Sequence, residues 1–117
     1  MEYYTFNPVI YPRLLWIAIG KDTLDGKFNL TEFPDNTDAL TESAFDEVNK
    51  KGGVFIRFEN IEAMTTSNIA HEAFHAAADI FDYIDAGIDI NNQEPTAYLL
   101  SWVAQCCDEV KSRHLDT

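Results

Sequence analysis

Two histidines one helical turn apart are the residues best spaced to do chemistry. They are the first and last residues of the segment His71-Glu72-Ala73-Phe74-His75. On a helix, side chains at positions i and i+4 share a face, so both imidazoles can reach one metal ion. Imidazole is an ordinary Zn²⁺ ligand in structural and catalytic sites. Glu72 projects about 100° from His71, beside the ion, where a general base can take a proton from metal-activated water. The segment therefore predicts a zinc site with a built-in base.

This segment resembles the H-E-x-x-H signature of the zincin metallopeptidases, and the residues after it resemble the gluzincin branch. In that branch a glutamate on the next helix is the third ligand, and here Glu94 follows His75 after residues 76–93. The stretch from Gln93 to Leu100 is similar to the ligand helix of small gluzincins. The resemblance covers residues 71–100 and implies a zinc-dependent peptidase with Glu94 as the third ligand. More loosely, it places a strand over 54–60 along the substrate cleft.

The resemblance also implies a side chain that stabilises the oxyanion, which larger gluzincins bring from a further subdomain. Tyr98 lies four residues after Glu94 and so shares its helix face, which makes Tyr98 the first candidate. Tyr83 and His114 are the alternatives.

Several acidic residues compete for roles around the histidines. Asp79 and Asp89 are rival third ligands, but His71 and Asp79 are about 12 Å apart along a helix axis, too far for both to bind one ion easily. Asp79 and Asp82 lie on the side of the helix where they can orient the histidine rings through the free N–H groups. Further candidates for that orienting role are Glu59 and Asn60.

The charge of the chain restricts its partners. Its 117 residues include 20 acidic and 8 basic side chains, and the formal net charge is −12. Nucleic-acid binding needs a basic face, and anionic membranes also repel such a chain. The predicted partner is therefore a protein or peptide substrate, with the oligomeric state left open. Because an acidic protein attracts divalent cations without specificity, the zinc prediction depends on the histidine pattern.

Length and composition predict one domain over residues 1–117 in the cytoplasm. A chain of this size with 46% hydrophobic residues can build a core without disulfides. No apolar run approaches the roughly 20 residues that span a bilayer, and residues 1–4 do not begin a signal peptide. Cys106 and Cys107 are adjacent, with side chains about 100° apart on a helix, so we expect reduced core thiols.

The helices and strands expected around the histidines indicate an α+β fold. We expect a small, mostly antiparallel sheet of about three strands packed against two long C-terminal helices. The expected strands are 9–19, 27–33 and 54–60, with a short helix over 42–50 and long helices from about 65–67 to 83–86 and from about 95 to 113. Asp25-Gly26 is a suitable hairpin turn between the first two strands.

Two other functional classes remain open. One is a zincin-like binding or regulatory module that holds metal without turnover. The other is a metal-free acidic interaction protein, which would make the spacing of His71 and His75 accidental. The presence of Glu72 favours the peptidase over the silent module, because a structural zinc site has no use for a base.

Overall fold

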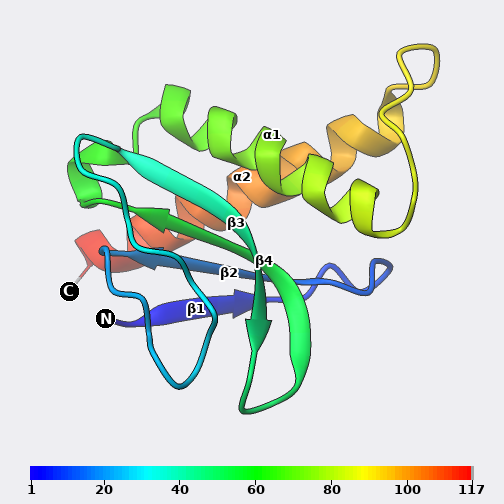
Figure 1. Ribbon diagram of the computed structural model, residues 1–117. Helices are drawn as coiled ribbons and strands as arrows, with labels where there is room; N and C mark the ends of the chain where they lie inside the picture. Colours follow the sequence, from blue (N-terminus) through cyan, green and yellow to red (C-terminus); the bar gives the residue numbers. More distant parts are fainter. Residues whose placement is uncertain (117) are drawn as a thin grey trace.

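The chain forms two layers, a four-stranded sheet and two long helices that both lie on one face of it (Figure 1). A computed structural model describes residues 1–116. The elements are β1 (Tyr3–Phe6), β2 (Leu14–Ile19), β3 (Ala39–Asp46), β4 (Lys51–Phe58), a short 3₁₀ turn (Ile61–Ala63), α1 (Thr66–Tyr83) and α2 (Glu94–Leu115). The α+β class and the two long C-terminal helices are confirmed.

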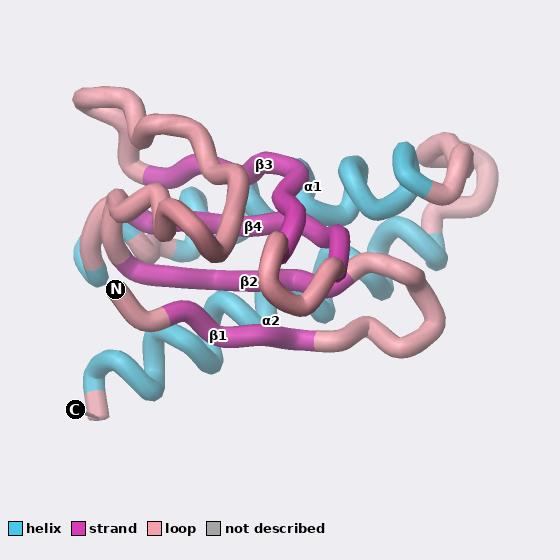
Figure 2. The backbone as a smooth tube through the Cα atoms, turned by 60° about the horizontal axis from the view of Figure 1, so that its bottom comes forward, coloured by secondary structure: helices cyan, strands magenta, loops and turns pink. Residues whose placement is uncertain are grey.

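The sheet differs from the expected one in strand number and in one pairing. Its order is β1-β2-β4-β3, with β2 parallel to β4 and the other two pairs antiparallel (Figure 2). The sheet is therefore mixed and has four strands rather than about three. The parallel pair forms because the chain leaves β2, builds the edge strand β3, and returns as β4 between them.

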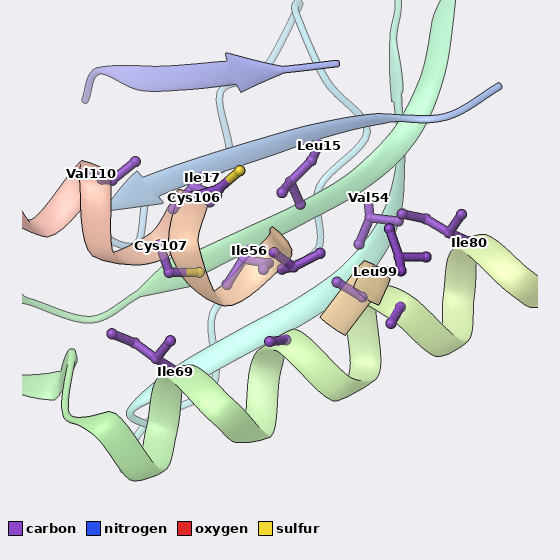
Figure 3. Packing of buried hydrophobic residues seen from close by; sticks show 14 of the residues in the cluster. Leu15, Ile17, Val54, Ile56, Ile69, Ile80, Leu99, Cys106, Cys107 and Val110 are labelled. Atoms are coloured by element: carbon purple, nitrogen blue, oxygen red, sulfur yellow. The ribbon is translucent and has the colours of Figure 1, made fainter. Parts of the chain in front are cut away.

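Burial on both faces explains why β2 and β4 are central. Leu15 and Ile17 of β2 and Val54 and Ile56 of β4 face the helices, where they meet side chains of α1 and α2 (Figure 3). On the other face Trp16 packs with Phe28 and Phe55 in a second cluster. Strands buried on both sides read as continuous apolar runs, as β2 does.

The predicted short helix over 42–50 is wrong. Residues 39–46 form β3, which pairs along its whole length with β4, and residues 47–50 make the turn between them. The apolar positions that suggested a helix, Ala44 and Phe45, instead point to opposite faces of the strand, since Ala44 is buried and Phe45 is exposed. Eight residues of ladder pairing with β4 outweigh a weak local helix preference.

The expected strands at the N-terminal end need correction. Residues 27–33 contribute only an isolated bridge between Phe28 and Asp46, and the segment packs Phe28 over the sheet as part of a long connection. The strand expected over 9–19 begins at Leu14, after Pro12, and the strand expected over 54–60 spans Lys51–Phe58. Strand β1 was not predicted, because four residues offer too short a pattern.

The long helices agree closely with expectation. Thr65 caps α1, accepting a hydrogen bond from the Asn68 backbone N–H, and Pro95 lies in the first turn of α2. Cys106 and Cys107 are unbridged and buried, as predicted. Burial raises the pKa of each thiol to about 12, so both stay protonated. Among the described residues, no helix has the length and apolar character needed to cross a membrane.

Candidate metal centre on helix α1

The imidazoles of His71 and His75 converge on the exposed side of α1. Their Nε2 atoms are 3.1 Å apart and their ring centroids 4.7 Å apart. Two nitrogens that each bind a tetrahedral zinc ion at its usual bond length would lie about 3.3 Å apart. The separation of the two Nε2 atoms is therefore close to that of two ligands of one zinc ion.

Glu72 is buried beside this pair rather than solvated. Its side chain lies between α1 and β3 with 7% of its surface exposed. One carboxylate oxygen, Oε1, accepts a hydrogen bond of 2.8 Å from Thr41 Oγ1, and the other, Oε2, lies 3.9 Å from His71 Nε2. A buried carboxylate is costly unless it is hydrogen-bonded. The Thr41 hydroxyl therefore holds one oxygen while the other faces the histidines.

The helix places these groups because its faces differ. Ile69, Ala73 and Ile80 enter the core, whereas the adjacent side of α1 presents polar residues to β3. Alternate residues of a strand share a face, so Thr41 and Ser43 both point toward α1. We call the contacts along this line the α1–β3 seam, which consists of Asn68 with Asp38, Glu72 with Thr41, and Asp79 with Ser43.

Asp79 belongs to the seam and does not contact the histidine rings. Its carboxylate accepts hydrogen bonds from Ser43 Oγ and from Arg13 Nη2, the latter at 3.1 Å. Arg13 also donates to the Gly53 carbonyl at 2.9 Å and lies over the Tyr83 ring, 4.4 Å from its centroid. Asp79 is thus a structural partner of Arg13. The Tyr83 ring contacts the same guanidinium.

The other proposed orienting residues also have different partners. Glu59 forms an ion pair of 3.8 Å with Lys21, and Asn60 caps the 3₁₀ turn through the Ala63 N–H. Asp82 is exposed on α1. None of these side chains makes a described contact with His71 or His75.

The structure does not bring Glu94 to the histidine pair. Glu94 is the exposed first residue of α2, which folds back along α1 after the connection 84–93 (Figure 1). His75 lies eight residues before the end of α1 at Tyr83, about 12 Å along its axis. Within residues 1–116, no three His, Cys, Asp or Glu side chains are grouped so that they could hold one metal ion.

The oxyanion candidates also lie away from the pair. Tyr98 is 71% exposed and lines an apolar pocket of about 430 Å³. The rest of that lining comes from α2 and from the loop between β1 and β2, namely Pro8, Ile10, Tyr11, Pro95, Leu99 and Trp102. His114, in the last turns of α2, lines a different pocket with Glu2, Tyr4 and Ile19. No residue of α1 lines either pocket.

Helix α1 packs against both β3 and β4, and β3 is the strand that contacts Glu72. Phe55 and Arg57 of β4 point to the opposite face, where Arg57 donates to Glu42 at 2.7 Å. Sequence reasoning missed Thr41 as a partner of Glu72. Residues 41–44 show no alternation of apolar and polar side chains, so the local pattern does not reveal this edge strand.

Comparison with protein families, characterised proteins and solved structures finds no match to this chain. The geometry of α1 and β3 is therefore the basis for any functional assignment.

Proposed function

We propose that this protein is a zinc-dependent metallopeptidase in which His71 and His75 hold the metal and Glu72 is the general base. The convergence of the two Nε2 atoms to 3.1 Å carries the proposal, together with the Glu72 carboxylate oxygen 3.9 Å from His71 Nε2. When bound, zinc supplies a Lewis acid that polarises the scissile carbonyl and makes a water molecule acidic near neutral pH. The zincin resemblance of this segment is consistent with that chemistry.

Glu72 moves the proton in this mechanism. Its Oε2, which accepts no hydrogen bond within residues 1–116, takes a proton from the attacking water and delivers it to the leaving amine. The hydrogen bond from Thr41 to Oε1 restricts the carboxylate to one orientation, so less freedom is lost on reaction. The burial of Glu72 keeps bulk water from competing for the base.

Glu94 remains our predicted third ligand. Two imidazoles alone leave a zinc site open at two positions, whereas catalytic sites have three protein ligands and one exchangeable position. For Glu94 to reach the pair, the first turn of α2 has to move toward His75, and the connection 84–93 is the segment that would permit it. Tyr98, one turn further along α2, remains the proposed oxyanion stabiliser.

The proposed substrate is a protein or peptide, and the proposed location is the cytoplasm. A net charge of −12 disfavours nucleic acid and anionic membranes as partners. Two protonated, buried thiols are compatible with a reducing compartment.

A second candidate is a catalytically silent zincin-like binding or regulatory module. One observation favours it: within residues 1–116, no third candidate ligand lies with His71 and His75. In that case His71 and His75 hold the metal without turnover, and Glu72 and Thr41 stabilise the contact of α1 with β3.

Zinc content and peptide cleavage test the proposal together. The protein, purified without metal affinity, should contain about one zinc per chain by elemental analysis, and His71→Ala or His75→Ala should remove it. Glu72→Gln should retain zinc while cleavage of a peptide library falls on the order of 100-fold or more. Glu62→Gln, an exposed substitution of the same type, is the matched control.

Each failure has a distinct meaning. Native protein without zinc would exclude the metallopeptidase. Zinc without peptide cleavage would favour the silent module. Loss of zinc in Glu72→Gln would show that Glu72 supports the metal site rather than acting as the base.

A further inference from the structure

The eight lysines and arginines of this acidic chain fall into two groups. Six use their charged groups within the protein, namely Arg13 with Asp79, Lys21 with Glu59, Lys27 with Asp46, Arg57 with Glu42, Lys111 with the Met64 carbonyl, and Arg113 with Glu109. Within residues 1–116, Lys50 and Lys51 make no ion pair and no side-chain hydrogen bond. With 20 acidic residues in the chain, two adjacent lysines without a carboxylate partner require an explanation.

Lys50 and Lys51 line one cavity together with Arg13. The cavity measures about 450 Å³ and lies between the β3–β4 turn and the loop that precedes β2. Its other lining residues are neutral: Asn7, Val9, Tyr11, Pro12, Leu14 and Gly52. The described lining contains no acidic side chain, and its unpaired positive charge comes from Lys50 and Lys51, since Arg13 is paired with Asp79.

Arg13 has an unused hydrogen-bond donor in this region. Its side chain is 9% exposed, and its Nη2 group donates to Asp79, Ser43 and Gly53. Its Nε–H is the one buried side-chain polar group without a hydrogen-bond partner within the described part of the chain. Buried donors are rarely left without an acceptor, and such exceptions call for a ligand, an ion or a water.

The backbone also accommodates the arginine closely. A Cβ at Gly52 would lie 3.0 Å from Arg13 Nη1, so a larger residue would push the guanidinium aside. Gly52, which lines the cavity, thus permits the guanidinium to lie against the start of β4.

We propose that this cavity binds a small oxyanion with two or more negative charges, a phosphate-bearing or polycarboxylate compound. Lys50 and Lys51, at the β3–β4 turn, supply two ammonium charges, and Arg13, in the loop before β2, supplies the unpartnered Nε–H donor. Both ligand classes share the chemistry that this lining recognises, oxygen acceptors carrying negative charge. The proposal does not depend on the metallopeptidase, because none of these residues belongs to the metal site.

Calorimetric titration of the whole protein tests the proposal, with inorganic phosphate and citrate as separate probes in chloride buffer. We expect saturable binding of at least one of them, weakened about tenfold or more in Lys50→Gln/Lys51→Gln. The control is Lys21→Gln/Arg113→Gln, which removes the same charge from exposed cations elsewhere and should bind the probe like the wild type. Circular dichroism verifies that each variant is folded.

The two probes distinguish the ligand classes. Binding of phosphate alone assigns the site to phosphate-bearing compounds, and binding of citrate alone to polycarboxylates. Absence of saturable binding of both probes at millimolar concentration would overturn the proposal. So would binding that the two double variants weaken equally, because the effect would then come from overall charge.

Discussion

The two helices lie on the same face of the sheet but meet it in different ways. Helix α2 packs on β2 through apolar side chains, with Val103, Cys107 and Val110 in one cluster with Leu15 and Ile17. Helix α1 meets β3 through the polar α1–β3 seam. The apolar contact is worth roughly 1.5–3 kcal/mol for each large side chain buried. A seam hydrogen bond to a carboxylate contributes about 1.5–3 kcal/mol, and unlike an apolar contact it defines the direction of each polar group.

The apolar contacts of α2 and the polar contacts of α1 therefore have different roles: the first stabilise the fold, and the second orient side chains. Apolar contacts have no direction, so the α2 side can stabilise the fold without orienting any reactive group. The seam holds the Glu72 carboxylate and, about two turns along, the Asp79 carboxylate in defined orientations. His71 and His75 lie on α1 next to this seam. The predictions below test whether the two contacts can be changed independently.

The largest expected effect is on the apolar side. Ile17→Ala removes a fully buried side chain of β2 and should lower the free energy of unfolding by about 2–5 kcal/mol. Urea denaturation measures this loss. The folded fraction should bind zinc as the wild type does, because Ile17 is not part of the seam. A parallel loss of zinc affinity in folded protein would contradict the separation of the two regions.

A smaller effect is expected in the seam. Thr41→Val removes the hydroxyl that donates to Glu72 Oε1 and leaves a buried carboxylate oxygen unsatisfied, at a cost of about 1–3 kcal/mol in the free energy of unfolding. Peptide cleavage should also fall, with zinc retained, and Thr41→Ser should restore both. Ser43→Ala is the matched control, since Ser43 lies on the same face of β3 and donates to Asp79. Equal loss of cleavage in Ser43→Ala would show that Thr41 has no special role.

The start of α2 tests whether this helix also contributes to the metal site. Glu94→Ala should weaken zinc binding about tenfold or more, which equals about 1.4 kcal/mol. Asp79→Ala should do so less, because Asp79 is bound to Arg13 and Ser43. Asp89→Ala should also have the smaller effect. Competitive zinc titration ranks the three variants, and a ranking with Asp79 or Asp89 above Glu94 would remove Glu94 from the site.

The last prediction concerns the far end of β3, away from the seam. Burial of the Asp46 carboxylate opposes its ionisation, but hydrogen bonds from Asn49 and Val48 and the ion pair with Lys27 outweigh burial and lower its pKa to about 2. Because this pKa lies below the ordinary value of 3.8, the ionised form stabilises the fold above about pH 4.

That stabilisation should be lost as the pH falls from about 4 to about 2. Urea denaturation across this range measures it, and Asp46→Asn should flatten this part of the pH dependence. The exposed Asp35→Asn is the control and should follow the wild type. Identical pH profiles for Asp46→Asn and the wild type would show that Asp46 does not stabilise the turn.

The sequence by itself determined the features that depend on neighbouring residues. Helix periodicity, the Thr65 cap and Pro95 define α1 and α2 almost to the residue. The i, i+4 spacing alone brings His71 and His75 together, because helix geometry is the same wherever the helix lies. The unbridged state of the two cysteines follows from the same geometry.

Only the tertiary structure decided how those helices meet the sheet. Thr41 and Glu72 are 31 residues apart, and Arg13 and Asp79 are 66 apart, so no local pattern links them. The segment 42–50 has weak helix signals, and pairing with β4 makes most of it part of an edge strand and its turn. Local preferences are worth tenths of a kcal/mol per residue, whereas a complete strand ladder is formed cooperatively. The partners of Glu72 and Asp79 therefore depend on strand register, which is defined only when the whole sheet assembles.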